Sequence, residues 1–502
     1  MKQKFSALLF SLFLSCGIYA QGEASHWFFG VRAGLNFKIT QTLNGVANVP
    51  TFESGPVNTS EGCFSLSSRQ GAFLFASDGI EVYNRNKVRM PNGAGLYGDP
   101  SSAQSGIVIP RPKHPNNFYI VTVSARLGPY HGLNYSEVDM TLDSGKGDII
   151  NKNKPLDYGG AKIGSVTIDR TDSYECITGV GHQNGTDYWL VHRSRDKFFA
   201  WLVTENGIGP SPTAVSEIGD DLGSGKTNTN PTIGYLKLSP DGKYVAHAGF
   251  TSRKMTVGEF DNATGKVSNI RVVNTNTPGP YGVEFSPSGE YLYWGTLNFG
   301  YAENSETRHR VYCAPIADLL IGSITNIRNI GCGISVQLAP DKRIYALLSE
   351  SRHLYMIEDP DAGGTSFKKF TNFFPSGNMT QRGLPTFTSS FLNLSDIITN
   401  PELPVCYGTE VEFSTQIYGG TGVLITGIEW DFGDGSPVVE EPDLTQYIFT
   451  QKHIYSKPGN YVLTLTVHKS DNSIVTSKEE KIDVRISRCI MPVNHNISVM
   501  GY

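Results

Sequence analysis

The sequence is poor in charge and has no long apolar run after its first twenty residues. Charged residues make up 18% of the chain, and a net charge of −5 is small for 502 residues, so composition does not indicate a nucleic-acid surface. The chain contains no G-x-S-x-G, no H-E-x-x-H and no His-x-His, which argues against a nucleophile elbow and a zincin helix. We therefore expect no catalytic residue, no metal ligand, no cofactor and, in the mature chain, no transmembrane segment.

Long amphipathic helical patterns are also missing, whereas turn-forming residues are abundant, with 54 Gly in the chain. This combination favours an all-β protein. About 480 mature residues is more than a single hydrophobic core usually supports, so we expect two or three domains.

A short hairpin motif returns three times at a period of roughly 50 residues. Ser239-Pro-Asp-Gly-Lys-Tyr-Val245 recurs at 286–292 and, more loosely, at 339–345. Each copy lies between two alternating apolar runs, and its central Pro and Gly predict a turn between half-buried strands. Repeated hairpins of this length are typical of propeller blades, because one small sheet cannot bury its own faces.

The three copies resemble the TolB-type propeller repeat, a resemblance that implies a fold but little about activity. Earlier blades are expected to open at 62–66, 106–111 and 163–168, with one more inner strand at 383–391. The strand-like runs 27–30 and 34–38 are expected to complete that last blade, so that the two chain ends close the ring. We predict a seven-bladed β-propeller over residues 21–394, with six or eight blades as alternatives.

The first twenty residues predict an export signal. Lys2 and Lys4 precede an apolar run over 5–15, and Ala20 ends a plausible cleavage site before Gln21. Acylation of Cys16, as in a lipoprotein, is the alternative that we favour less. Either route predicts a protein of the periplasm, the outer membrane or the cell surface.

Several motifs in the propeller region resemble those of a family of exported Bacteroidota proteins. They are W-[FY]-F-G-x-x-A-G-[LI]-[ND]-F at 27–37, E-G-C at 61–63, F-x-S-D-G near 75–84, M-P-N-G at 90–93, S-S-x-Q-S-G at 101–106, G-L-x-Y-S-x-V-D-M at 132–140 and G-L-P-x-F at 383–387. The resemblance covers roughly residues 26–392 and implies a background in type IX secretion or gliding motility.

The composition changes after residue 394. The elements W-D-F-G-D-G at 430–435, H-x-Y at 453–455 and P-G-x-Y-x-V-x-L-x-V at 458–467 resemble the PKD-type immunoglobulin-like domain in order and spacing. The predicted organisation is a signal peptide (1–20), a β-propeller (21–394), a linker (395–404), a PKD-type domain (405–487) and a C-terminal tail (488–502). That tail is too short for the sorting domain carried by larger members of the Bacteroidota family.

Each candidate functional residue also has a purely structural explanation. Asp431 and Asp434 have oxygens suited to calcium, but a calcium site needs six to eight oxygens, so we expect them to stabilise a turn. Asp241 and Asp341 have the same interpretation. A sugar- or peptide-binding face is the less favoured hypothesis for five aromatic residues, which more often pack between blades: Tyr130, Tyr135, Trp294, Tyr301 and Tyr312.

Six cysteines remain after removal of the signal, an even number that permits disulfides in an exported protein. Cys406 and Cys489 bracket the PKD-like region and are the favoured pair. Cys63, Cys176 and Cys332 lie in or beside strand runs, where a buried thiol behaves as a small apolar residue.

The sequence favours a non-catalytic docking scaffold of the cell envelope, with a protein partner in the outer-membrane type IX secretion or gliding machinery and no nucleic-acid partner. The alternative is a glycan-acting hydrolase or lyase, or a glycan-binding surface protein, with its site in the propeller funnel. Two carboxylates about 5 to 10 Å apart in a deep funnel would favour the enzyme, and a flat or plugged funnel would favour docking.

Overall fold

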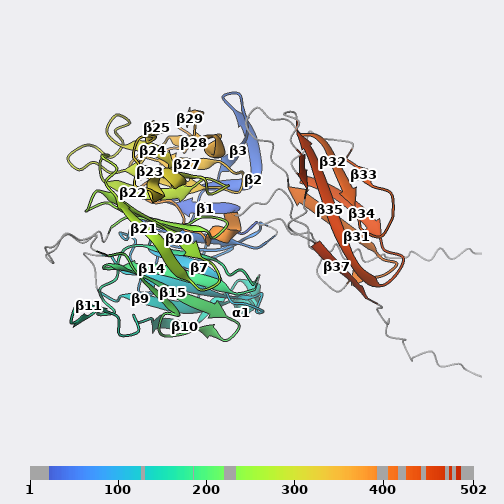
Figure 1. Ribbon diagram of the computed structural model, residues 1–502, viewed down its shortest axis with the longest axis horizontal. Helices are drawn as coiled ribbons and strands as arrows, with labels where there is room; N and C mark the ends of the chain where they lie inside the picture. The colour runs from blue at the N-terminus through green and yellow to red at the C-terminus, as the bar shows by residue number, and fades with distance from the viewer. Residues whose placement is uncertain are drawn as a thin grey trace, which may run out of the picture. The chain divides into compact units, whose positions relative to one another are not determined.

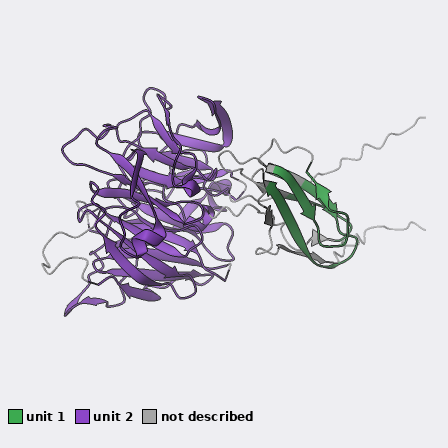
Figure 2. Ribbon diagram, turned by 45° about the horizontal axis from the view of Figure 1, so that its top comes forward, with its two compact units in different colours: residues 1–20, 395–502 green, residues 21–394 purple. Residues whose placement is uncertain are grey.

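The computed structural model describes residues 22–392, except 70, 126–129, 185 and 220–232, and in the C-terminal part residues 405–416, 425–441, 448–469, 474–476 and 482–487. Contacts between Cα atoms divide the chain into two compact units, residues 21–394 and residues 395–502 together with 1–20 (Figure 1, Figure 2). The predicted signal peptide with Cys16, the linker 395–404 and the tail 488–502 lie outside the described residues.

The larger unit, residues 21–394, consists of successive antiparallel sheets, each made mainly of strands that follow one another in the chain. The first three sheets contain β1 (His26–Phe29), β2 (Ala33–Leu43) and β3 (Val46–Phe52); β4 (Phe64–Ser67), β5 (Phe73–Ser77) and β6 (Val82–Asn84); and β7 (Gly106–Pro110), β8 (Asn117–Val123), β9 (Leu133–Asp139) and β10 (Asp148–Pro155).

Four further sheets follow in the same manner. They contain β13 (Ile177–Gly181), β14 (Tyr188–Ser194), β15 (Lys197–Thr204), β16 (Gly207–Ile208) and β17 (Ala214–Glu217); β18 (Leu236–Leu238), β19 (Tyr244–Gly249), β20 (Lys254–Asp261) and β21 (Lys266–Val273); β22 (Pro280–Phe285), β23 (Tyr291–Thr296), β24 (Arg310–Pro315) and β25 (Arg328–Cys332); and β26 (Ser335–Leu338), β27 (Ile344–Leu347), β28 (Leu354–Ile357) and β29 (Phe367–Phe370).

Helical segments are short. The described residues contain α1 (Leu142–Gly145), α2 (Ile316–Leu320) and two 3₁₀ turns, η1 (Pro360–Ala362) and η2 (Ser389–Leu392). Among these residues, no helix is long and apolar enough to cross a membrane.

The first strand of each sheet contacts the first strand of the next. The contacts run from β1 to β4, then to β7, β13, β18, β22 and β26. Connections between consecutive antiparallel strands alternate between the two ends of a sheet. The loop between the second and third strands and the loop that leads to the next sheet therefore share one face of the unit.

The last sheet contacts the first. The Arg343 guanidinium donates hydrogen bonds of 3.1 Å to the carbonyls of Ala47 and Asn48 in the β2–β3 hairpin. The rings of Trp27 and Tyr345 pack edge to face with centroids 5.9 Å apart. Aromatic packing and hydrogen bonds thus join the sheets nearest the two ends of this unit.

The three copies of the repeated motif form the turns of the hairpins β18–β19, β22–β23 and β26–β27, as the sequence predicts. Gly242 and Gly289 take left-handed backbone conformations, with φ of +71° and +76°. Lys342 has to take the same region, at +61°, in the third copy. The Ser239 hydroxyl accepts a 2.9 Å hydrogen bond from the backbone N–H of Tyr244, so the turn is fixed by its own residues.

Two predictions about strands are wrong. The run 163–168 does not open a sheet, because residues 162–167 form the small hairpin of β11 (Lys162–Ile163) and β12 (Val166–Thr167), and the sheet begins with β13. The run 383–391 is not an inner strand completed by β1 and β2, which instead pair with each other, β2 pairing in turn with β3. Pro385, which lacks an N–H to donate, makes only an isolated parallel bridge with Cys63.

The C-terminal unit is also all-β. Its strands are β30 (Val405–Cys406), β31 (Glu410–Gln416), β32 (Ile425–Asp431), β33 (Val439–Glu440), β34 (Ile448–Ile454), β35 (Gly459–Lys469), β36 (Ile474–Thr476) and β37 (Ile482–Ser487). One sheet has the order β30-β37-β35-β32-β33 with β36 beside β35, and β31 pairs with β34. Both sheets contribute to one buried cluster: Val411, Phe413, Ile428, Trp430, Phe432, Phe449, Tyr455, Leu463, Leu465 and Val467.

Candidate functional site

Residues 380–392, which we call the axial segment, lie along the first strands of the larger unit. Their hydrogen bonds reach four sheets, at or directly before the first strand: Thr386 N–H to the Cys63 carbonyl (2.9 Å), Thr388 Oγ1 to the Val108 carbonyl (2.7 Å), Gly181 N–H to Ser390 Oγ (3.0 Å) and Leu384 N–H to the Tyr235 hydroxyl (3.0 Å). Leu384, Thr386, Phe387 and Thr388 are buried. The axial segment is therefore buried against the first strands of four sheets.

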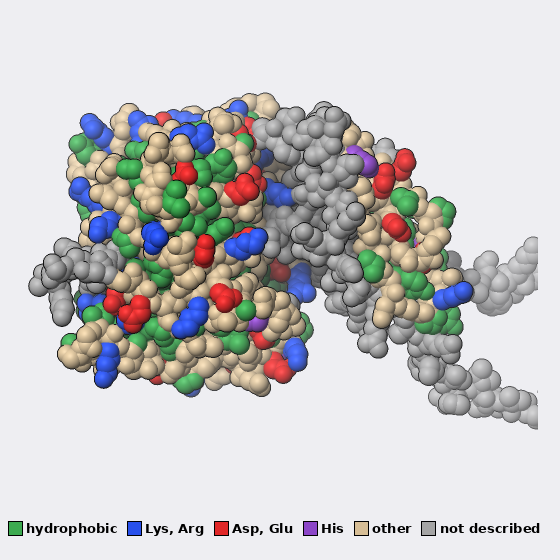
Figure 3. All heavy atoms as spheres, in the orientation of Figure 1, with side chains coloured by type: hydrophobic (Ala, Val, Ile, Leu, Met, Phe, Trp, Pro, Cys, Tyr) green, Lys and Arg blue, Asp and Glu red, His purple; other side chains and the backbone are tan. Residues whose placement is uncertain are grey.

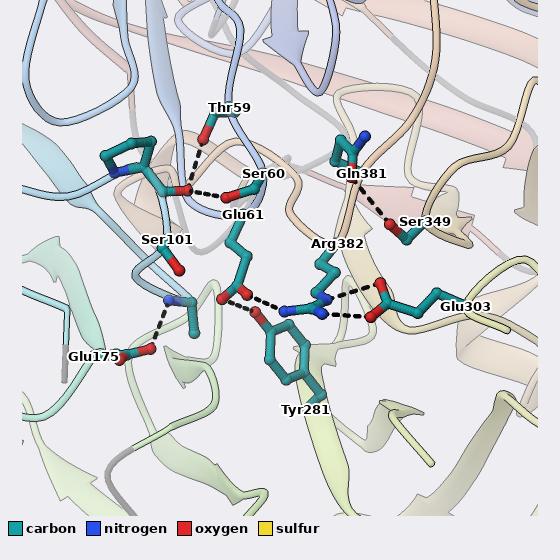
Figure 4. Close-up of polar contacts among 12 residues, drawn as sticks. Thr59, Ser60, Glu61, Ser101, Glu175, Tyr281, Glu303, Ser349, Gln381 and Arg382 are labelled. Atoms are coloured by element: carbon teal, nitrogen blue, oxygen red, sulfur yellow. Dashed lines mark hydrogen bonds and ion pairs between the residues drawn. The ribbon is translucent and has the colours of Figure 1, made fainter. Parts of the chain in front are cut away.

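At one end of the axial segment, Arg382 joins two carboxylates from distant parts of the chain (Figure 4). Its guanidinium binds Glu303, in the β23–β24 loop, through two parallel hydrogen bonds, one of them 2.8 Å long. Another guanidinium nitrogen binds the carboxylate of Glu61, which precedes β4. The hydroxyl of Tyr281, in β22, donates a 2.7 Å hydrogen bond to the other Glu61 oxygen. We call these four residues the arginine clasp.

The pKa values of the two clasp carboxylates are shifted in opposite directions. Burial raises the pKa of Glu61 above its usual value, against the hydrogen bond from Tyr281 and the charge of Arg382. Burial also disfavours ionisation of Glu303, but the hydrogen bonds and charge of Arg382 outweigh it, so the pKa of Glu303 is lowered. Hydrogen bonds from the guanidinium to Glu303 raise the pKa of Arg382 in turn. The bidentate pairing is the strong form of such an interaction.

A second polar cluster ties first strands together inside the unit. Lys237 in β18 donates a 2.6 Å hydrogen bond to Gln337 in β26 and lies 3.0 Å from the carboxylate of Glu284 in β22. The Gln104 side chain, before β7, accepts hydrogen bonds from the backbone N–H groups of Ile177 and Leu236. All these side chains are buried, and hydrogen bonds of this kind offset the cost of burying them.

Sequence reasoning did not identify the arginine clasp, although its motifs included part of it. In the clasp, Glu61 belongs to the E-G-C motif and Arg382 directly precedes G-L-P-x-F; in the second polar cluster, Gln104 belongs to S-S-x-Q-S-G. The signal was the presence of charged or amide residues in these motifs. Nothing in their spacing indicated that segments more than 300 residues apart would meet.

The aspartates singled out from the sequence lie in turns. Asp241 accepts a hydrogen bond of 2.6 Å from Ser239, and Asp341 one of 2.7 Å from the Tyr345 hydroxyl. Asp431 accepts one from the N–H of Gly433, and Asp434 forms a 2.7 Å pair with His453. For Asp434, burial is outweighed by hydrogen bonds from Ser436 and His453, which lower the pKa to about 2. No cluster of three or more metal-binding side chains occurs among the described residues.

The five aromatic candidates are not brought together into one face. Trp294 is fully buried, donates to the Thr277 hydroxyl and stacks on Tyr312 at a centroid distance of 5.9 Å. Tyr135 lines a small cavity of about 230 Å³ together with Arg111, Tyr119, Glu137, Asn151, Lys154 and residues 206–208. Tyr130 and Tyr301 are exposed on separate loops.

Among the cysteines whose side chains the structure describes, four are free and buried: Cys63, Cys176, Cys313 and Cys332. Burial raises the pKa of each thiol, to about 11 for Cys332 and about 12 for Cys176. They therefore act as small apolar residues. The predicted disulfide between Cys406 and Cys489 stays a prediction, because Cys489 lies outside the described residues. The backbone of Cys406 pairs with that of Ser487, which precedes Cys489 by two positions.

The surface in Figure 3 carries basic and acidic side chains interspersed over the larger unit, without a field of one sign on the face shown. A second cavity, of about 410 Å³, is lined by Ser252, Arg253, Lys254, Asn274, Asn276 and Thr277. It lies between the β19–β20 and β21–β22 loops and is distinct from the arginine clasp.

Comparison with known families matches residues 397–484 to the PKD domain. No curated protein sequence matches the chain. Solved structures similar to it include TolB from Acinetobacter baumannii (11% identity, 56% of this chain and 57% of that one, TM-score 0.29). They also include the Pseudomonas aeruginosa periplasmic gluconolactonase PpgL (14%, 58% and 78%, 0.32) and the β-propeller domain of Cps50 (Swd1) from Myceliophteria thermophila (12%, 71% and 99%, 0.36). At TM-scores below 0.5, these likenesses carry no argument about activity.

Proposed function

We propose that this protein is a non-catalytic docking scaffold of the cell envelope, built from a closed seven-bladed β-propeller and a PKD-type immunoglobulin-like domain. In this proposal the seven sheets of residues 21–394 are the blades, and the contact between the last sheet and the first closes the ring. The loops at the ends of the blades bind a partner, and the PKD-type domain serves as a spacer or a second contact.

The observation that carries the proposal is that the axial segment is buried against the first strands and that its Arg382 binds both clasp carboxylates. A glycoside hydrolase needs two carboxylates with room between them for a sugar or a water molecule. Here Glu61 and Glu303 are both bound by one guanidinium. The arginine clasp thus uses its charges to join the axial segment to the sheets, and its geometry supports a structural role.

Rigid loops suit a docking role. Blades that pack on both neighbours fix the loops between them, so little conformational entropy is lost when a partner binds. The resemblance of the sequence motifs to exported Bacteroidota proteins supports a partner in the outer-membrane type IX secretion or gliding machinery, and a location in the periplasm or at the outer membrane.

The experiment is affinity purification from envelope fractions after chemical cross-linking, with charge-reversal variants on one loop-bearing face compared with variants on outer strands. We expect substitutions on the binding face to abolish co-purification without a change in melting temperature. The purified protein should not turn over envelope glycans, peptides or esters. Robust hydrolysis that is lost in Glu61→Gln or Glu303→Gln would overturn the proposal in favour of a glycan-acting enzyme.

A further inference from the structure

The loops between β19 and β20, between β21 and β22, and between β23 and β24 form one continuous surface on the same face of the larger unit. The N–H of Leu297 donates a 2.9 Å hydrogen bond to the carbonyl of Gly279, which joins the second and third loops. The ring of Phe299 packs edge to face on Phe250, at the start of the first loop, with centroids 4.8 Å apart. We call residues 250–254, 274–279 and 297–309 the three-loop surface.

Aromatic side chains project from this surface into solvent. Phe299 is 71% exposed and Tyr301 is 45% exposed, and both lie on the β23–β24 loop. The guanidinium of Arg308 lies over the ring of Tyr301 at 4.3 Å from its centroid. Exposed Phe, Tyr and Arg side chains are those most enriched at the centres of protein interfaces.

Hydrogen bonds to the buried His309 side chain hold the β23–β24 loop that carries these rings. The imidazole of His309, which is fully buried, accepts a hydrogen bond from the N–H of Asn298 through Nδ1 and bonds the carbonyl of Ala302 through Nε2. Phe250 packs on Tyr281, whose hydroxyl belongs to the arginine clasp. The surface therefore rests on the clasp, and its loops need little reordering when a partner binds.

The three-loop surface carries two exposed arginines, Arg253 and Arg308. The cavity of about 410 Å³ between the first two loops is lined by Arg253 and Lys254 and by no acidic residue, and Lys254 already has an interaction partner within the protein. The two acidic residues of the third loop are each paired with a cation of the unit, Glu303 with Arg382, which also binds Glu61, and Glu306 with Lys369 at 2.5 Å. Arg253 is exposed, and Arg308 is exposed with its guanidinium over the ring of Tyr301.

We infer that the three-loop surface binds an acidic segment of a partner protein in which carboxylates alternate with apolar side chains. The carboxylates pair with Arg253 and Arg308, and an apolar side chain packs on Phe299 beside the cavity. The volume of the cavity falls within the range of ligand pockets, about 300–1,000 Å³. This inference rests on the proposed docking function and names the surface and the chemistry of the partner.

The test uses fluorescence anisotropy with the purified chain and a short fluorescein-labelled peptide in which Glu alternates with Leu and Phe. A peptide with Lys in place of Glu reports binding by apolar contact alone. We expect the Glu peptide to bind more tightly than the Lys peptide, and the difference to shrink at high ionic strength, because exposed charges are screened. Phe299→Ala and the double variant Arg253→Glu/Arg308→Glu should each weaken binding of the Glu peptide by about tenfold.

Matched controls lie away from the surface. Ile321 is 76% exposed at the connection between β24 and β25, at the opposite end of the sheet, and Arg271 is an exposed cation on β21. Ile321→Ala and Arg271→Glu should leave peptide binding unchanged, and all variants should keep the wild-type melting temperature.

Equal binding of the Glu and Lys peptides, or equal binding by wild type and the three-loop variants, would overturn the inference. The docking proposal is judged separately, by co-purification from envelope fractions. A partner that the three-loop variants retain would place the docking site elsewhere on the protein. Absence of any partner together with measured hydrolysis would overturn the docking proposal itself.

Discussion

Removing the guanidinium of Arg382 tests whether the axial segment is fastened to the sheets as the arginine clasp indicates. Arg382→Met keeps most of the apolar stem but leaves Glu61, a buried carboxylate, with only the Tyr281 hydroxyl as a clasp partner. Breaking a buried ion pair by removing one partner typically costs about 3–5 kcal/mol. The side chains of Arg382 and Glu303 are 31% and 25% exposed, so water compensates in part. We expect a loss of about 2–3 kcal/mol in the free energy of unfolding near neutral pH.

The loss should depend on pH in a defined direction. The pKa of Glu61 is already raised by burial, and removal of Arg382 raises it further. A raised carboxyl pKa destabilises the fold only as pH rises above the unfolded value of 4.5. The pKa of Glu303 is instead lowered, because the hydrogen bonds and charge of Arg382 outweigh the effect of burial. In the wild type, ionised Glu303 therefore stabilises the fold at pH values above its unfolded pKa, and this stabilisation is lost as the pH falls. Both effects make the loss largest near neutral pH and smaller near about pH 4.

Urea unfolding followed by tryptophan fluorescence is a suitable assay, because four of the five Trp residues belong to the larger unit. The matched control is Arg195→Met, which removes an ion pair with a single, partly exposed carboxylate. Arg195 lies 2.6 Å from Asp172, and the two side chains are 32% and 29% exposed. That control should cost less than about 1 kcal/mol. If Arg382→Met costs no more than the control, or costs the same at both pH values, the clasp does not stabilise the fold as argued.

Four other predictions follow from single positions. Trp430→Ala should destabilise the C-terminal unit by about 3–5 kcal/mol, because it removes a fully buried ring from a small core; calorimetry should show one of two transitions shifted, and a uniform shift would contradict the unit boundary. Lys342→Gly should stabilise the larger unit by about 0.5–1 kcal/mol, measured as a higher melting temperature, because a left-handed φ costs a side chain more than it costs glycine; an unchanged or lower value would argue against this. Peptide mapping without reductant should find Cys406 joined to Cys489, and two free thiols at these positions would disprove the pair. N-terminal sequencing of the exported protein should begin at Gln21, and a lipid-modified start would refute cleavage there.

The sequence alone determined the local structure of the larger unit wherever a turn motif lies between two alternating runs. Pro and Gly fix the backbone of such turns, and the period of two fixes which side chains are buried, so the hairpins β18–β19, β22–β23 and β26–β27 follow from residues close together in the chain. The match of residues 397–484 to the PKD domain was equally local, since W-D-F-G-D-G and the alternating run after it carry their own turn and core pattern.

Only the tertiary structure decided which distant segments meet. The run 383–391 has the residues of a buried strand, but burial and hydrogen bonding do not require a ladder. The axial segment instead makes single hydrogen bonds to four sheets, two through backbone N–H groups and two through side-chain hydroxyls. The arginine clasp joins Glu61, Glu303 and Arg382 across separations that no local pattern encodes. The period of two in a strand predicts which face of the sheet a side chain lies on. Which charged neighbours surround that side chain depends on how the sheets pack against one another, and this packing is set by long-range contacts.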